Sequence, residues 1–180
     1  MMSEVTYMNK ETIFWMLVTI SALGAIGFLL GESDGEPPFS TADERHALAK
    51  ECIGSHDGGL AEHYHATVRV SIHGEFISIP DDVGLNDEGC SMRPLHTHSA
   101  DGKIHIEMKE EGTEAPLEAF FDIWGKHMDS TGFDDYLVNE TTEFLMFVTD
   151  AGGNQEEVTS FQNHILADGQ TIDLVFRDKA

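Results

Sequence analysis

Basic residues are scarce in this chain of 180 residues, which has 10 Lys+Arg against 33 Asp+Glu and a formal net charge of −23 at pH 7. Nucleic-acid binding needs clusters of Lys and Arg that displace counterions from phosphate, and docking on anionic lipid headgroups needs them too. The shortage therefore argues against both kinds of partner. Hydrophobic residues still make up 41% of the chain, which excludes a mainly disordered protein.

Cysteine and the common catalytic motifs are also nearly absent. The chain has 2 cysteines, too few for a small fold that depends on many disulfides. It has no Gly-x-Ser-x-Gly elbow, no phosphate-binding Gly-rich loop before a helix and no His-Glu-x-x-His helix. Nucleophilic catalysis therefore has little support, and we name no catalytic residue.

One long hydrophobic run extends from Ile13 to Leu30, 18 residues without a charge between Glu11 and Glu32. At about 1.5 Å per residue it spans roughly 27 Å, close to the hydrocarbon core of a bilayer, and Trp15 lies where an interfacial aromatic residue belongs. A cleaved signal peptide would have a charged leading region, a shorter run and a small-residue cleavage site. We therefore predict an uncleaved transmembrane signal anchor, with a cleaved signal as the alternative.

The flanks of this run indicate its orientation. Lys10 precedes it, whereas three acids and no basic residue follow within residues 31–40. The positive-inside rule then places residues 1–12 in the cytoplasm and the rest of the chain outside. Residues 31–45 have the composition of an acidic Gly/Pro spacer, and residues 46–180 form the outer domain. We expect a single-pass protein of the cell membrane with its C-terminal domain outside the cytoplasm.

The outer domain shows strand patterns and one principal helix. Apolar residues at helical spacing follow Pro116, which predicts a helix over 116–127 whose aromatic stripe packs in the core. A short polar helix is predicted over 41–51, where Thr41 and Glu44 have capping-box spacing. We expect an α+β fold with mostly antiparallel strands. Alternation and turn residues predict strands at 63–72, 75–79, 94–98, 103–108, 142–149 and 171–176.

Ligand-type residues recur in pairs at positions i and i+2. In a strand, two such residues point to the same face about 6.5–7 Å apart, so each pair could share an ion or flank a site completed by a neighbouring strand. The three pairs are His63 and His65, His96 and His98, and His105 and Glu107. The remaining histidines lack this spacing and are expected to be surface or core residues: His46, His56, His73, His127 and His164.

A hairpin around Asp101-Gly102 would bring two of these pairs together. A two-residue turn places His98 opposite His105, whereas a four-residue loop over 99–102 places His96 opposite His105. Both alternatives keep the ligand-type residues on one face of the hairpin. The strand that carries His63 and His65 is the natural partner of this cluster.

Imidazole ligands with one carboxylate suit Zn²⁺, Cu²⁺, Fe²⁺ or Ni²⁺ and not Ca²⁺ or Mg²⁺, which prefer oxygen. We predict a copper or zinc ion as the cofactor, and the acidic surroundings would help to recruit it. The alternative is a buried network of hydrogen-bonded histidines with a stabilising role.

Cys52 and Cys90 lie on the side of the membrane that we infer to be oxidising. A disulfide between them would close a loop of about 38 residues and contribute about 3–4 kcal/mol in the chain-entropy model. It would also brace the segment that precedes His96. A cysteine ligand to the metal is the alternative.

Several motifs follow one another through the outer domain: His63-Tyr64-His65, Ile79-Pro80 with Gly84, Cys90, Leu95 to His98, Gly102, Ile104 to Glu107, and Phe120 to Gly125. In this order they resemble the signature of a poorly characterised family of secreted or membrane-anchored proteins from archaea and bacteria. The resemblance covers about residues 52–176 and implies an extracytoplasmic module with a metal site. Ser99 stands where the family commonly has an Asp. From residue 140 onward the hydrophobic pattern is similar to the end of a ubiquitin-like roll.

Three functions are compatible with these patterns. The first is a membrane-anchored extracytoplasmic protein that holds or delivers copper or zinc. The second uses the same cluster as the catalytic centre of a metal-dependent enzyme, with Glu107 or His63 as the base. The third is a structural or partner-binding ectodomain, whose partner at the membrane the sequence does not identify.

Overall fold

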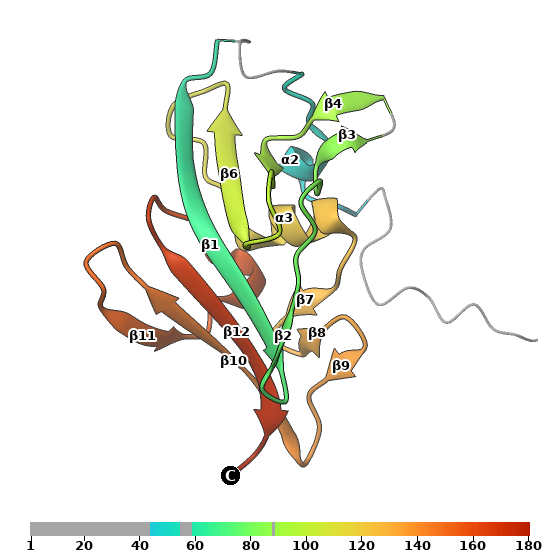
Figure 1. Cartoon of the computed structure of the whole chain (residues 1–180), viewed down its shortest axis with the longest axis vertical. Coiled ribbons are helices and arrows are strands. Elements are labelled where there is room, and N and C mark those ends of the chain that lie inside the picture. The colour runs from blue at the N-terminus through green and yellow to red at the C-terminus, as the bar shows by residue number, and fades with distance from the viewer. Residues whose placement is uncertain (1–43, 55–58, 88) are drawn as a thin grey trace, which may run out of the picture. The chain divides into compact units, whose positions relative to one another are not determined.

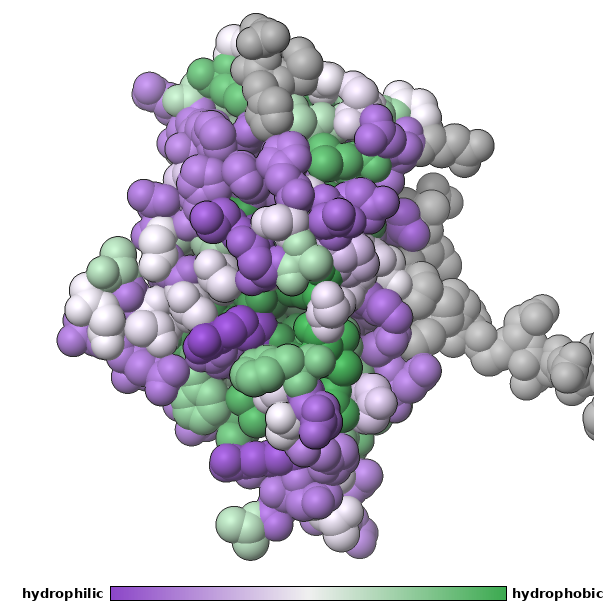
Figure 2. Space-filling model, viewed as in Figure 1, coloured by the Kyte–Doolittle hydropathy of each residue, from purple (hydrophilic) through white to green (hydrophobic). Residues whose placement is uncertain are grey.

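The computed structural model describes residues 44–54, 59–87 and 89–180, which all lie in one compact unit, Pro37–Ala180. Within that part of the chain no helix is both long and apolar enough to cross a bilayer. The expected anchor at 13–30 lies outside the described residues and stays a prediction. Figure 2 shows hydrophilic side chains over most of one face of the molecule, with hydrophobic ones gathered around the lower ends of β1 and β2.

A seven-stranded sheet forms the framework, and β1 lies in its interior (Figure 1). Its strands have the order β11–β10–β12–β1–β6–β5, and β2 pairs with β1 beyond the end of β6. The pair β1 and β12 is parallel, whereas the other neighbours in this sheet are antiparallel. The strands are β1 (Glu62–Ile72), β2 (Glu75–Ile77), β5 (Leu95–His96), β6 (Lys103–Met108), β10 (Thr142–Thr149), β11 (Gln155–Val158) and β12 (Thr171–Asp178).

The alternation of residues along the strands separates a core face from an open face. On β1, Val68 and Val70 are buried, while His63 and Arg69 point to the opposite face. Ile104 on β6 is fully buried and lies on the core side in the same way. The six strands predicted from the sequence all form. They lie in one mostly antiparallel sheet, which together with the helices described below confirms the α+β class. The parallel pairing of β1 with β12 was not predicted.

Helix α3 (Leu117–Trp124) covers the core face, where Phe120 and Phe121 are almost completely buried. It begins after Pro116, as predicted, but it ends before the predicted position 127. The reason is Gly125, which adopts a left-handed conformation (φ 71°), so that the following amide, Lys126 N, donates to Phe121 O at 3.0 Å.

Helix α2 (Ala47–Lys50) is a single turn, much shorter than the helix predicted over 41–51. His46 caps it, because its Nδ1 accepts a hydrogen bond from the amide of Leu48 at 3.2 Å. The backbone amide of His46 donates to Asp122 Oδ2 on α3 at 2.6 Å and so ties the two helices together. Thr41 of the expected capping box lies outside the described residues.

Short elements fill the connections and were not predicted. A two-stranded sheet leads into β5, and a three-stranded sheet follows α3. These elements are β3 (Leu85–Asp87), β4 (Cys90–Met92), β7 (Met128–Asp129), β8 (Gly132–Phe133), β9 (Tyr136–Leu137) and the 3-10 helix η1 (Phe161–Asn163).

Candidate metal centre

Three neighbouring strands, β1, β6 and β5, bring the predicted ligand residues together on the open face. Across β1 and β6, His65 pairs with His105 and His63 pairs with Glu107. Across β5 and β6, His96 pairs with His105. This register is the one expected for the four-residue loop, so the alternative with a two-residue turn is wrong. His105 therefore lies between the histidines of β1 and those of the β5 segment.

The loop takes this form because Gly102 packs against β1. Its carbonyl accepts a hydrogen bond from Val68 N at 2.9 Å, and its φ of +79° lies in the left-handed region. A Cβ atom at this position would lie 2.2 Å from Val68 O, so the close approach requires glycine.

The first group of ring nitrogens consists of His63, His65 and His105, whose ligand atoms all lie within 4.8 Å of one another. His65 Nε2 lies 3.1 Å from His105 Nδ1, and His63 Nε2 lies 3.4 Å from the same atom. The group is partly open to solvent, because His63 is exposed while the other two rings are half-buried.

The second group consists of His96, His98 and His105, whose ligand atoms also lie within 4.8 Å of one another. His96 Nε2 lies 3.2 Å from His98 Nε2. The ring of His105 is edge-on to that of His98, with centroids 4.7 Å apart, and is stacked with that of His96 at 5.3 Å. His96 is fully buried and His98 is exposed, so this group extends from the interior to the surface.

The orientation of His96 is fixed by the backbone. Its Nδ1 lies 3.0 Å from the carbonyl oxygen of Arg93, which can only accept, so Nδ1 carries the hydrogen and donates it. The neutral ring then has its lone pair on Nε2, the atom directed at His98. A histidine held in this way by a backbone carbonyl is typical of metal ligands, because the hydrogen bond sets both the tautomer and the ring orientation.

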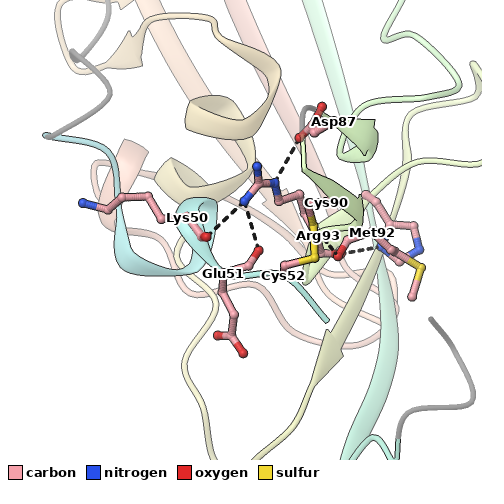
Figure 3. A network of polar contacts seen from close by, with 8 residues as sticks. Lys50, Glu51, Cys52, Asp87, Cys90, Met92 and Arg93 are labelled. Atoms are coloured by element: carbon pink, nitrogen blue, oxygen red, sulfur yellow. Dashed lines mark hydrogen bonds and ion pairs between the residues drawn. A yellow bond between two sulfur atoms is a disulfide. The ribbon is translucent and has the colours of Figure 1, made fainter. Parts of the chain in front are cut away.

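Arg93 is itself held on three sides (Figure 3). Its Nε donates to Asp87 Oδ2 at 3.0 Å, and its Nη1 donates to the carbonyls of Lys50 and Glu51 at 3.0 and 3.3 Å. The backbone amide of Arg93 donates to Gly84 O at 2.8 Å. The carbonyl that orients His96 is therefore part of a rigid segment.

The disulfide between Cys52 and Cys90 forms as predicted, with Cα atoms 5.6 Å apart (Figure 3). It joins the segment after α2 to the strand that precedes Arg93. The amide of Ile53 donates to Met92 O at 3.0 Å and adds a second connection between these segments. Cys52 and Cys90 are thus bracing residues and not metal ligands.

Thr97, between the two histidines of the second group, is fully buried. Its hydroxyl donates to Pro80 O at 2.7 Å and accepts from the amide of Val83 at 3.2 Å. Its own amide donates to Val83 O at 3.0 Å. These bonds direct Thr97 inward and leave the histidines before and after it on the opposite side.

Glu107 is fully buried and lies on the same face of β6 as His105. Its Oε1 lies 3.4 Å from His63 Nε2. It therefore lies next to the first group of nitrogens without belonging to either three-histidine group. Its assignment as a direct ligand stays a prediction, whereas its contact with His63 is a property of the structure.

Sequence patterns identified the histidines but not the residues that position them. Arg93 and Thr97 act through backbone carbonyls and amides of other segments, for which no local pattern exists. Among the histidines without i, i+2 spacing, His56 lies outside the described residues. The other four have partners away from the cluster: His46 with Leu48, His73 with Asp178, His127 with Asp129 and Thr131, and His164 with Ser160 and Gln170.

The five histidines could thus hold a metal ion, which confirms the coarser prediction of a histidine site. No protein-family model, no curated protein and no solved structure matches this chain. The function therefore has to follow from the chemistry of the site.

Proposed function

We propose that this protein binds a transition-metal ion, copper or zinc, in the histidine cluster and holds or delivers it on the outer side of a membrane. The observation that carries the proposal is the convergence of ring nitrogens at 3.1–3.4 Å around His105 and between His96 and His98. Two nitrogens bound tetrahedrally to one ion at 2.0–2.1 Å lie about 3.3 Å apart. The spacing in the cluster therefore matches that of metal ligands.

A network of hydrogen bonds explains the two contacts of His105 Nδ1 less well. His105 Nδ1 lies near both His63 Nε2 and His65 Nε2. A neutral ring nitrogen either donates one hydrogen or accepts along one lone pair in the ring plane, so a hydrogen bond would satisfy one of these two contacts well. An ion between the three nitrogens would satisfy all of them.

The donor set supports copper or zinc. All five histidines offer imidazole nitrogen, which these ions prefer, and the two cysteines are joined to each other in a disulfide. Ca²⁺ and Mg²⁺ would need several oxygen ligands. The excess of 23 negative charges would raise the local concentration of a divalent cation by electrostatic steering.

The disulfide supports an extracytoplasmic location, since such bonds persist in oxidising compartments. Together with the predicted anchor at 13–30, it underlies our proposal of a single-pass membrane protein with its C-terminal domain outside. Protease added to intact cells that express the full chain should degrade that domain. Protection of the domain until the cells are lysed would contradict this orientation.

Metal analysis tests the binding proposal directly. The full chain, purified in a non-ionic detergent and stripped with a chelator, is incubated with Cu²⁺ or Zn²⁺, desalted and measured by mass spectrometry of the elements. We expect at least one ion per chain; less than about 0.1 ion per chain would contradict the proposal. His105→Ala removes the residue shared by both groups and should abolish binding.

A matched control separates an ion site from a stabilising histidine network. His73→Asn removes a histidine in the turn between β1 and β2, at the end of β1 away from the cluster, and Asn tolerates the positive φ of 48° there. Zn²⁺ should raise the melting temperature of the wild type and of His73→Asn, but not of His105→Ala. If His105→Ala lowers the melting temperature equally with and without metal, the network interpretation is favoured.

Glu107 favours a second candidate, a metal-dependent enzyme that uses the same cluster. A buried carboxylate 3.4 Å from His63 is positioned to take a proton near an ion bound there. The zinc-loaded chain should then hydrolyse p-nitrophenyl acetate, and Glu107→Gln should reduce the rate about 100-fold or more at unchanged zinc content. Absence of turnover, or equal rates in the two proteins, would leave metal holding or delivery as the function.

We also propose that the chain shares its metal site with the archaeal and bacterial family that its signature resembles, and that its end forms a ubiquitin-like roll. Residues of the signature surround the cluster: Pro80 and Gly84 accept hydrogen bonds from Thr97 and Arg93, and Gly102 shapes the hairpin. This supports a shared metal site in such a family. The antiparallel pair β10–β11, followed by β12 parallel to β1, supports a ubiquitin-like roll for the end of the domain.

A further inference from the structure

We propose that the cluster holds two metal ions, one in each three-histidine group, with the ring of His105 as their common ligand. The inference rests on the proposed metal binding and specifies its stoichiometry. The first site, site A, consists of His63, His65 and His105. The second, site B, consists of His96, His98 and His105.

The arrangement of strands separates the two sites. β1 and β5 lie on opposite sides of β6, because His105 pairs with His65 on one side and with His96 on the other. Neighbouring strands are about 4.8 Å apart, so the backbones of β1 and β5 are roughly 10 Å apart. The histidines of β1 and those of the β5 segment therefore approach one another from two directions, with the ring of His105 between them.

The distances within each site suit one ion each. In site A, His105 Nδ1 lies 3.1 and 3.4 Å from the two Nε2 atoms of β1. In site B, the Nε2 atoms of His96 and His98 are 3.2 Å apart, and the ring of His105 is in contact with both rings. All of these nitrogen separations are close to the edge of about 3.3 Å expected for a tetrahedral ion.

The ring of His105 can serve both ions because imidazole has a nitrogen on each side. Nδ1 lies next to the Nε2 atoms of site A, and the other ring nitrogen, Nε2, is assigned to site B. Binding of both ions forms two nitrogen–metal bonds and releases the single N–H proton of the neutral ring to solvent. Three histidines at each ion leave a fourth position, which water or a ligand from a partner protein could occupy.

The two sites also differ in what supports them. Site A is bordered by the buried carboxylate of Glu107, 3.4 Å from His63 Nε2. Site B is anchored by the buried ring of His96, which donates to the carbonyl of Arg93. We therefore expect site B to be the more rigid of the two and to fill first.

Copper titration of the full chain tests this inference. The metal-free protein in non-ionic detergent receives Cu²⁺ in steps, and bound copper is counted after desalting. We expect two ions per chain in the wild type and one ion in each of His65→Ala and His98→Ala, which disable sites A and B separately. The control His73→Asn should keep two ions. Circular dichroism checks that each variant is folded, and His65→Gln replaces His65→Ala if the latter is not.

Electron paramagnetic resonance gives a second measure that does not depend on counting alone. Two Cu²⁺ ions on one imidazole couple magnetically. The spin concentration obtained by integrating the spectrum of the wild type should therefore be lower than its copper concentration. In His65→Ala and His98→Ala the spin concentration should equal the copper concentration. One ion per chain in the wild type, lost in both variants, would overturn the two-ion inference and leave metal binding intact. Failure of the wild type to bind any ion would instead overturn the proposed function.

Discussion

The residue Thr97 shows how a small side chain can position two candidate ligands, His96 and His98, at once. Its hydroxyl donates a hydrogen bond to Pro80 O and accepts one from Val83 N. These two bonds hold the backbone on either side of Thr97 in place. Val has almost the same shape without the hydroxyl. Thr97→Val would therefore leave the carbonyl of Pro80 and the amide of the buried Val83 without these bonds, and it should lower the free energy of unfolding by about 1–3 kcal/mol.

Urea denaturation of the two proteins measures this difference. The control is Thr159→Val, since Thr159 is exposed and its replacement should change the free energy of unfolding by less than about 0.5 kcal/mol. Thr97→Val should also bind Zn²⁺ more weakly than Thr159→Val. Equal stability of the two variants would show that the hydroxyl does not hold the segment.

Asp101 makes the hairpin loop sensitive to acid. Hydrogen bonds from Lys103 N at 3.0 Å and from Ser99 Oγ at 2.8 Å lower the pKa of Asp101 below its ordinary value. A lowered pKa in the folded state means that the carboxylate stabilises the fold above its unfolded pKa, and that this contribution is lost as the pH falls through the lowered value. Asp101→Asn should therefore be less stable than the wild type near neutral pH.

The difference should shrink as the pH falls through the lowered pKa of Asp101, below which both side chains are uncharged. Urea midpoints of the wild type and of Asp101→Asn, measured at about pH 7 and at about pH 2, well below the ordinary pKa of an aspartate, give the comparison. Ser99→Ala should show a smaller difference with the same pH dependence. A gap between wild type and Asp101→Asn that is equal at both pH values would contradict the role of the charge.

At the scale of elements, the hairpin β5–β6 shows what the sequence can and cannot specify. Alternation placed His96, His98 and His105 on one face in either register, because a shift by two residues keeps every side chain on its side. The sequence could not choose between the registers. That choice depends on the packing of Gly102 against Val68 of β1, a contact between segments far apart in the chain.

The same packing allows a matched comparison of two glycines. Gly102 and Gly74 both have positive φ, +79° and +86°, so replacement by Ala costs backbone strain of about 1–2 kcal/mol at each. At Gly74 the new Cβ would meet nothing within 4 Å, whereas at Gly102 it would lie 2.2 Å from Val68 O. Gly102→Ala should therefore lower the unfolding free energy by clearly more than Gly74→Ala.

Denaturant unfolding of both variants measures the two losses, and zinc binding reports on the hairpin. Gly102→Ala should weaken zinc binding, since it separates β6 and its loop from β1 and so moves His105 from His65. Gly74→Ala, in the turn between β1 and β2, should not weaken zinc binding. Equal losses of stability would mean that the hairpin can move away from β1 without cost.

At the scale of the whole molecule, the parallel pairing of β1 with β12 joins residues about one hundred positions apart, such as Val68 and Ile172. The hydrophobic alternation predicted both strands, because each buries one face. It could not predict that they are neighbours, since alternation is a property of a single strand and does not identify its partner. For the same reason the alternation predicted β1 and β6 as strands but did not determine that they pair. Their pairing at His65 and His105 was expected only because both strands carry ligand-type residues.

The net charge of −23 gives a prediction for the whole molecule. Ion pairs such as Arg69–Asp173 and Arg177–Glu143 lie on the open face, but 10 basic residues can pair with only a minority of the 33 acids. Repulsion among the other carboxylates therefore exceeds the attraction within the exposed pairs, which are worth little. Salt screens both, so added NaCl should raise the melting temperature.

Two variants test the balance of these charges. Glu157→Gln removes an exposed carboxylate on β11 beside Glu156, and it should raise the melting temperature at low salt. Arg69→Gln removes the partner of Asp173 and should lower it. Both differences should shrink between about 0.01 and 1 M NaCl, because the screening length falls from about 30 to about 3 Å. A melting temperature of the wild type that falls over this range would mean that the ion pairs, and not the excess of carboxylates, dominate the electrostatic energy of the fold.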